Sequence, residues 1–209
     1  MKLIALTLIF LFTAIFSFAQ RFEIGSAIGL GYTKPVSGWP TEHPFSNTER
    51  TVGGLSGYMQ PIEVAYNIGR YQFGMALNYT ALIYYWGNYE TASNGKMFFA
   101  KNMSELIGGL PIKILANRVF TVRKFQFYGG LSAGFVNDRA ETRSAWTGGL
   151  QLGGTWWFVK HCGLNINAAA DYYNVHYNGS IPDGTPSFDP NAAALNFPLT
   201  VGLRYSFLK

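Results

Sequence analysis

The chain has 209 residues, of which 13% are charged and 17% aromatic, with 24 glycines, one cysteine and a formal net charge of +5. This composition excludes a disordered chain, which needs low hydrophobicity and high charge, and a disulfide scaffold, which needs paired cysteines. The length favours a single domain. Charge at about half the usual soluble share of roughly 25%, with many aromatics, indicates a protein whose outside is not all water.

Residues 1–19 have the three-part plan of a secretory signal peptide. A basic Lys2 is followed by the apolar run Leu3–Phe16 and by small residues before a cut after Ala19. The run is shorter than the roughly 20 residues that a membrane-spanning helix needs, although an uncleaved anchor helix is the alternative. We therefore predict an exported mature domain over 20–209.

Bulky apolar residues then alternate with small or polar ones, which is the period of a β-strand and not of a helix. Most of these segments are longer than the five or six residues of a typical soluble strand, and a tilted membrane strand needs about 9 to 11. Eight segments share this alternation: 22–32, 58–68, 71–86, 102–114, 125–136, 146–158, 163–173 and 195–207.

Charge separates the two faces of these segments. No Asp, Glu, Lys or Arg falls on the apolar faces, as a lipid-facing surface requires, because Arg or Lys at mid-depth in hydrocarbon costs about 2–4 kcal/mol. We expect the charged residues of the opposite faces to form a structural salt-bridge network inside a lumen, with a gated ion path as the alternative. These residues are Glu23, Glu63, Glu105, Lys113, Asp171 and Arg204.

Aromatic residues gather at both ends of the apolar faces, as in the two aromatic girdles of a membrane barrel. One end is predicted to hold Phe22, Tyr66, Tyr71, Phe73, Phe125, Phe127, Trp156, Phe158, Tyr205 and Phe207. The other end is predicted to hold Tyr32, Tyr58, Tyr85, Phe135, Trp146 and Tyr172.

Short and long connections alternate along the chain. Residues 68–70 form a tight turn and 115–124 a medium turn, whereas the proline-rich loops 33–56 and 178–193, and the segment 87–101, are long. Short periplasmic turns with longer outer loops are typical of outer-membrane proteins. The predicted fold is all-β, an eight-stranded antiparallel up-and-down transmembrane β-barrel with a packed polar lumen, and a soluble periplasmic β-sandwich is the alternative.

Three segments resemble a known family. Glu105–Lys113 and Lys124–Gly134 resemble two successive strands of the small outer-membrane β-barrel proteins of Bacteroidota, the PorT-like and OmpX-like barrels. Val201–Phe207 resembles the C-terminal signal read by the barrel-assembly machinery, although Leu208 and Lys209 follow the final aromatic. The resemblance implies a bacterial outer-membrane location, with membrane lipids and the assembly machinery as partners.

The sequence offers few residues for chemistry. After His176 it has Asn178 where the lipid A deacylase pattern His-x-Ser-Asn has its nucleophile. His161 and Cys162 are adjacent and too few for a closed metal site. The basic residues form no stripe of the kind that binds nucleic acid. We therefore predict no catalytic residue, no cofactor, no metal site and no nucleic-acid partner.

The predicted role is structural or partner-binding, with the loops 33–56 and 178–193 presenting a surface to an envelope protein or ligand. A narrow porin-like channel for ions or small solutes is the second hypothesis, although eight strands leave an interior that side chains fill. A lipid-modifying enzyme with its site at the rim is the third.

Overall fold

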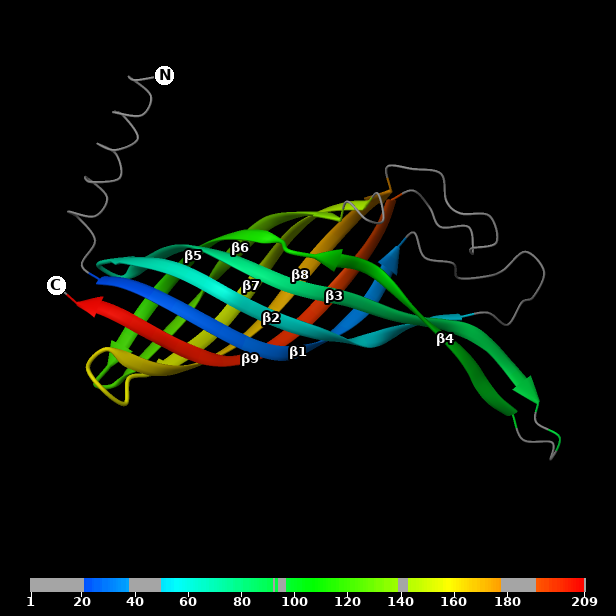
Figure 1. Cartoon of the computed structure of the whole chain (residues 1–209), viewed down its shortest axis with the longest axis horizontal. Helices are drawn as coiled ribbons and strands as arrows, with labels where there is room; N and C mark the ends of the chain where they lie inside the picture. Colours follow the sequence, from blue (N-terminus) through cyan, green and yellow to red (C-terminus); the bar gives the residue numbers. More distant parts are fainter. Residues whose placement is uncertain are drawn as a thin grey trace, which may run out of the picture.

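The computed structural model describes the backbone of residues 21–37, 50–91, 93, 97–138, 143–177 and 191–208. Its described side chains are those of residues 21–37, 53–82, 93, 110–137, 144–176 and 192–207. The strands of Figure 1 are β1 (Arg21–Ser37), β2 (Arg50–Ile68), β3 (Tyr71–Thr91), β4 (Met97–Gly109), β5 (Ile112–Val122), β6 (Phe125–Asp138), β7 (Arg143–Trp156), β8 (Cys162–Tyr177) and β9 (Asn191–Leu208). Within these ranges no helix is long and apolar enough to cross a membrane.

The strands form one closed antiparallel barrel. β1 pairs with both β2 and β9, and the pairing of β2 with β3 completes the ring. β4 and β5 follow one another along the same edge of β3, so the nine strands occupy eight positions around the barrel. The predicted all-β fold with eight antiparallel positions is therefore confirmed.

The two ends of the barrel differ in their connections. The turn end, as we call it, holds the short connections 69–70, 123–124 and 157–161, together with the pair Arg21 and Leu208. Gly69 has a φ of 61°, which glycine adopts at no steric cost in a two-residue turn. The opposite end, the loop end, lies to the right in Figure 1.

The predicted medium turn at 115–124 is wrong, because β5 continues to Val122 and only residues 123–124 form the turn. The predicted strand 102–114 is also divided at Pro111, which has no N–H to donate to a ladder. The Asn78 amide still donates to the Pro111 carbonyl oxygen at 3.0 Å, so β3 remains paired across the division. Arg118, on the outward side of β5, interrupts the apolar alternation and hid the continuing strand from sequence reasoning.

Two predicted loops are shorter than expected. Residues 33–37 and 50–56 of the first predicted loop lie in β1 and β2, and residues 191–193 of the second lie in β9. Residues 38–49 and 178–190 lie outside the described residues. The buried side chains of these extensions include those of Thr33, Ser56 and Ala192, which are small, so the contrast between the two faces is too weak to indicate a strand.

β3 and β4 continue as a hairpin that projects beyond the rest of the loop end (Figure 1). Their pairing runs to Thr91 and Met97, so the predicted loop at 87–101 is largely paired strand. β6 ends at Asp138, and β4 stands last in the order of paired strands. Among the described residues, the edge of β4 that faces away from β3 therefore has no ladder partner.

A register shift in β2 changes which residues face inward. The shift lies between Met59 and Ile62 and includes Pro61, a residue that sheets tolerate at bulges. Tyr58 is consequently buried in the interior, and its predicted place in the aromatic girdle is wrong.

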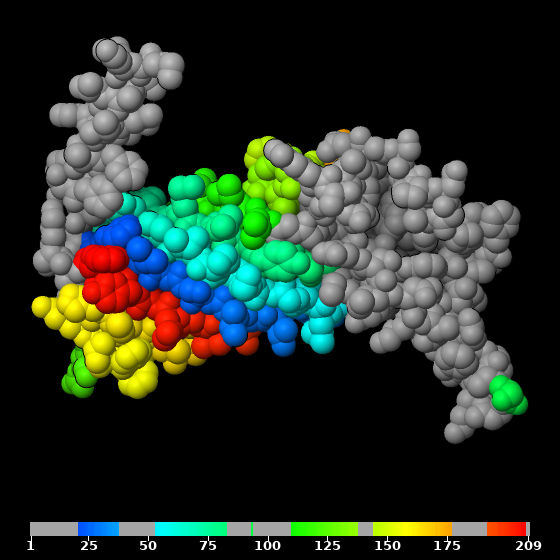
Figure 2. Space-filling view, viewed as in Figure 1, coloured from blue at the N-terminus to red at the C-terminus, as the bar shows by residue number. Residues whose placement is uncertain are grey.

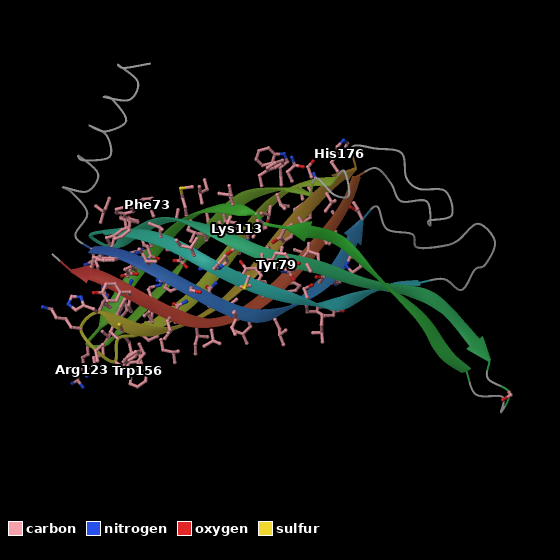
Figure 3. All side chains as sticks on the ribbon, viewed as in Figure 1. Phe73, Tyr79, Lys113, Arg123, Trp156 and His176 are labelled. Atoms are coloured by element: carbon pink, nitrogen blue, oxygen red, sulfur yellow. The ribbon has the colours of Figure 1, made fainter. Side chains whose placement is uncertain are left out.

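Large apolar side chains cover the outward side of the strands. Figure 3 shows them standing away from the barrel wall, and Figure 2 shows a continuous outer wall over β1, β2 and β9. Exposed examples from different strands are Leu30, Met75, Ile114, Leu131, Leu152, Ile166 and Leu203.

Candidate functional site in the lumen

The inward faces bring together five of the six predicted lumen charges. Glu23, Glu63, Lys113, Asp171 and Arg204 are all buried. The sixth, Glu105, pairs with Ile83 in the β3–β4 ladder, and its side chain lies outside the described residues.

Arg204 is the centre of a cluster near the turn end. Its Nη1 lies 3.3 Å from Oε2 of Glu23 and its Nη2 lies 2.7 Å from Oε1 of Glu63. Arg21 adds a contact of 3.1 Å between its Nε and Oε1 of Glu23. Two guanidinium groups thus face two carboxylates, so the cluster is balanced in charge and links β1, β2 and β9.

Amide side chains extend this cluster across the interior. Asn67 and Gln72 donate to Glu23 at 2.8 and 3.2 Å, Gln60 donates to Glu63 at 2.6 Å, Asn117 donates to Gln72 at 3.0 Å, and Gln151 donates to Asn117 at 2.7 Å. The network reaches from β2 to β7, and its hydrogen bonds compensate for the removal of these polar groups from water.

Trp157 covers the turn end of the interior. Its indole N–H donates to Oε1 of Gln126 at 3.1 Å, and the Arg21 guanidinium carbon lies 3.8 Å from a Trp157 ring centroid. Sequence reasoning missed this residue because it follows the last residue of β7. The two adjacent tryptophans could have indicated it. Because Trp156 continues the outward alternation of β7, Trp157 has to face the other way.

A second cluster lies further along the barrel. Nζ of Lys113 is 2.6 Å from Oδ2 of Asp171, and the Ser132 hydroxyl donates to Oδ1 of the same carboxylate at 3.3 Å. The Lys113 ammonium also lies 6.0 and 5.8 Å from the ring centroids of Tyr58 and Tyr173. This cluster is also balanced, with one cation and one anion.

Glycines on neighbouring strands make room for the lumen charges. A Cβ on Gly134 would lie 2.8 Å from Cγ of Lys113, and a Cβ on Gly149 would contact Oδ1 of Asp171. The long side chains therefore occupy the volume that the glycines leave free. Four of the described lumen charges pair with glycines in the ladders: Arg204 and Glu63 with Gly25, Lys113 with Gly134, and Asp171 with Gly149.

The interior is apolar toward the loop end, where sequence reasoning expected small and polar residues. The cluster there combines aliphatic side chains with one tyrosine, and each of its residues is at most 1% exposed. Its members are Leu82, Val136, Ala145, Tyr173, Val175, Ala192 and Ala194. The described interior thus has a polar section near the turn end and an apolar section near the loop end.

The described aromatic residues of the predicted girdles lie on the outer side, apart from Tyr58. At the turn end these are Phe22, Tyr66, Tyr71, Phe73, Phe125, Phe127, Trp156, Phe158, Tyr205 and Phe207. At the loop end they are Tyr32, Phe135, Trp146 and Tyr172. Neighbouring rings meet at both ends, with centroids 4.9 Å apart for Phe22 and Tyr66 and 4.7 Å apart for Phe135 and Trp146. The Tyr85 side chain lies outside the described residues.

The histidines have separate surroundings. Nδ1 of His161 lies 2.8 Å from the Ser206 carbonyl oxygen, and its ring stacks on Tyr205 with centroids 5.8 Å apart. His176 is exposed near the loop end (Figure 3), and His43 lies outside the described residues. Across the described ranges, no group of three or more His, Cys, Asp and Glu residues is placed to hold a metal ion.

No family model matches the chain, and no curated protein matches it. Among solved structures, outer membrane protein AlkL in DMPC lipid bilayers is 13% identical, with 92% of each chain covered and a TM-score of 0.50. Neisserial surface protein A is 14% identical over 90% of this chain and 98% of that chain, with a TM-score of 0.49. The outer membrane protease OmpT from Escherichia coli is 9% identical over 90% and 96%, with a TM-score of 0.36.

Of these three likenesses, only that to AlkL reaches a TM-score of 0.5, and at 13% identity it bears on the fold alone. The chain thus has the fold of small outer-membrane β-barrels. The narrower resemblance to the Bacteroidota barrels stays a prediction.

Proposed function

We propose that this chain is a bacterial outer-membrane β-barrel with a closed interior, which binds a partner or supports the envelope through the parts at its loop end. The observation that carries the proposal is the separation of residues by face, since the described acidic side chains are all buried inside an apolar outer wall. In this proposal residues 1–19 are a cleaved signal peptide, the assembly machinery inserts the barrel, and the turn end faces the periplasm. The resemblance of residues 105–134 favours a place among the small Bacteroidota barrels.

The outward side chains support the membrane location. Leu30, Leu152 and Leu203 are 64, 69 and 63% exposed and belong to three different strands. Fully burying one such side chain gains about 1.5–3 kcal/mol relative to leaving it in water, and soluble monomers rarely expose large contiguous apolar patches. A hydrocarbon environment removes this cost for the whole wall at once.

The interior supports a barrel that does not conduct. Arg204 and its carboxylate partners occupy the lumen near the turn end, Trp157 covers that end, and the apolar cluster fills the section near the loop end. Small eight-stranded barrels have interiors just wide enough for side chains to fill. We therefore favour the closed barrel over the channel.

The β3–β4 hairpin supports a binding role at the loop end. An unpaired strand edge presents backbone N–H and C=O groups that another chain can pair with. The edge of β4 that faces away from β3 is such an edge among the described residues. The hairpin thus joins the loops 33–56 and 178–193 as a candidate surface for an envelope protein.

Heat-modifiable migration on a gel, combined with membrane fractionation, tests the location. A soluble protein with no heat shift would refute the membrane barrel in favour of a periplasmic sandwich. In a planar bilayer we expect no current above leak, and a steady current would favour the channel. Incubation with labelled lipid A or phospholipid should leave the lipid unchanged, and a new product would favour the enzyme.

The role of the hairpin has its own experiment. Tyr84 pairs with Ser104, so replacing residues 85–103 by an Asn-Gly turn shortens the hairpin without changing its register. We expect the shortened protein to show the same heat shift and to lose envelope partners that the full chain captures after cross-linking. Capture of the same partners by both proteins would contradict a role for the hairpin.

A further inference from the structure

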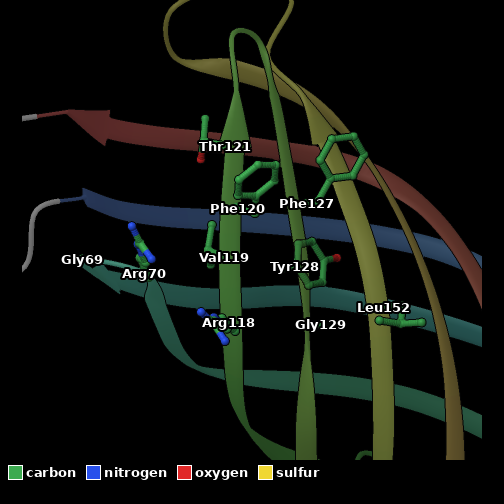
Figure 4. A pocket seen from close by; sticks show the side chains of 10 residues that line it. All are labelled: Gly69, Arg70, Arg118, Val119, Phe120, Thr121, Phe127, Tyr128, Gly129 and Leu152. Carbon is green, nitrogen blue, oxygen red and sulfur yellow. The ribbon is translucent and has the colours of Figure 1, made fainter.

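A groove crosses the outer wall at the turn end, between the β2–β3 turn and β7 (Figure 4). It has a volume of about 690 Å³ and combines the cationic side chains of Arg70 and Arg118 with the apolar side chains of Phe120, Phe127 and Leu152. This volume lies within the range of about 300–1,000 Å³ that is common for small-molecule sites.

Two glycines keep the floor of this region low. Gly129 faces outward between Arg118 and Leu152 in the paired strands, and a Cβ there would lie 2.7 Å from Cδ2 of Leu152. Gly154 takes the corresponding place beside Phe127, with 3.4 Å between its added Cβ and the ring. A trough therefore runs between the Phe127 ring and the Leu152 side chain.

The trough runs from the rim of the barrel into the apolar wall. Arg118 pairs with Tyr71, the first residue of β3, whereas Leu152 and Ala168 in the same row lie well inside β7 and β8. A second groove of about 730 Å³ shares Phe127 and Leu152 with the first and reaches Ala168. The cationic end is thus at the rim, and the apolar end is deeper in the wall.

The two arginines form a cationic pair at the rim. The Val119 amide donates to the Arg70 carbonyl oxygen at 2.8 Å, which holds the β2–β3 turn against β5 beside Arg118. Both arginines are exposed, and Figure 4 shows them at one side of the groove. Guanidinium groups recognise phosphate through two parallel hydrogen bonds.

The charge around this pair favours an anionic ligand. Arg123, Lys124 and Lys160 are also exposed at the turn end, whereas every described acidic side chain is buried in the lumen. Each basic residue near a membrane surface contributes about 1 kcal/mol of attraction to anionic lipids. The side chains of the groove therefore join an anion-attracting rim to an apolar trough.

We propose that this groove binds one anionic glycerophospholipid of the membrane leaflet at the turn end. Arg70 and Arg118 hold the phosphate, and one acyl chain lies in the trough between the Phe127 ring and the Leu152 side chain. The site rests on the proposed membrane location and adds a specific ligand to it.

Native mass spectrometry of the full mature barrel, released from vesicles of phosphatidylglycerol and phosphatidylcholine, tests the site. We expect the unchanged protein to retain one phosphatidylglycerol molecule. Arg70→Gln and Arg118→Gln should each weaken this retention about tenfold, which is the scale of one charge-assisted contact. Gly154→Leu fills the trough without changing charge and should weaken retention as well.

Matched controls separate a site from general attraction. Lys124→Gln with Lys160→Gln removes two charges from the same end outside the groove, and Gly148→Leu adds the same side chain to the outward face of β7. A loss in these controls equal to that in the groove variants would overturn the site. Equal retention of phosphatidylcholine, or no retained lipid from a correctly heat-modifiable barrel, would also overturn it.

Two further outcomes identify the reason for failure. A photo-cross-linking residue at Phe120 should capture lipid in whole cells, and capture of a periplasmic protein in its place would overturn the lipid assignment. A soluble chain without a heat shift would refute the membrane location itself, so the two failures are distinguishable.

Discussion

Lys113→Met tests the energetic role of the lumen pair most directly. Lys113 and Asp171 have side chains only 4 and 0% exposed, with 2.6 Å between Nζ and Oδ2. Methionine retains most of the side-chain volume but leaves the carboxylate with the Ser132 hydroxyl as its described side-chain partner. Breaking a buried ion pair by removing one partner costs about 3–5 kcal/mol, because the remaining charge is uncompensated. We expect that loss in the free energy of unfolding.

The double variant Lys113→Met/Asp171→Asn separates the uncompensated charge from the loss of contact. Replacing both members of a buried pair by well-packed apolar residues is often close to neutral. Asp171→Asn removes the uncompensated charge while keeping the side-chain volume, so the double variant should recover most of the lost stability. Ser132→Ala removes one hydrogen bond from the same charged carboxylate and should cost about 1.5–3 kcal/mol. These three costs should therefore follow the order single lysine variant, serine variant, double variant.

Urea unfolding of the barrel in lipid vesicles, followed by the heat-dependent gel shift, measures these free energies. The reasoning is refuted if Lys113→Met unfolds within about 1 kcal/mol of the unchanged protein, or if the double variant is as unstable as the single one. Either result would mean that an uncompensated charge on Asp171 is not the cost of losing Lys113.

Three further substitutions test how the wall and the interior are packed. Gly149→Val should lose about 1–3 kcal/mol of stability by overpacking, since its Cβ would lie 2.6 Å from a backbone carbonyl oxygen. The control Gly148→Val, on the outward face, has no neighbour closer than 3.9 Å to its added Cβ and should lose less. Equal midpoints of urea unfolding for the two variants would contradict this. Leu199→Lys in the middle of the wall should cost about 2–4 kcal/mol of stability, and Val36→Lys at the rim about 0–1 kcal/mol. Folding into vesicles measures both costs. A larger cost for Val36→Lys than for Leu199→Lys would place the membrane elsewhere on the wall. Trp157→Ala should cost about 3–5 kcal/mol on the gel-shift assay as a buried aromatic truncation, and no change would mean that it does not close the turn end.

The outward faces could be predicted because hydrocarbon imposes one strict rule. Lipid excludes Asp, Glu, Lys and Arg along the whole middle of a strand, so the charge pattern gives the side on which each segment faces the interior. The segments of Glu23 and Asp171 were correctly oriented in this way. Arg118 lies at the rim, where the cost of a charge falls, and the rule therefore failed to place its segment in a strand.

The contacts inside the lumen could not be predicted, because alternation gives the face of a residue and not its depth. Arg204 reaches Glu23 and Glu63 only through the register that sets β1 between β2 and β9. Register depends on turn lengths and bulges, and one shift beside Met59 reverses the side on which Tyr58 falls. Pro61 is compatible with a bulge at this place, but it does not specify the register on either side of the shift.

The described charges of the lumen and of the surface differ in their balance, and this bears on where the barrel can bind. The described lumen charges cancel, with Arg21, Lys113 and Arg204 against Glu23, Glu63 and Asp171. The lumen charges that the structure describes therefore add nothing to the net charge. The exposed cations among the described side chains are Lys34, Arg70, Arg118, Arg123, Lys124 and Lys160.

All of these cations except Lys34 lie at the turn end. A screened surface charge acts only within about 10 Å at moderate salt, so these cations act on whatever lies against that rim and not on the loop end. A partner held at the loop end must be recognised by shape, backbone pairing or side chains there. Raising the salt concentration should therefore weaken lipid retention at the turn end, and retention that does not change with salt would contradict binding through these cations.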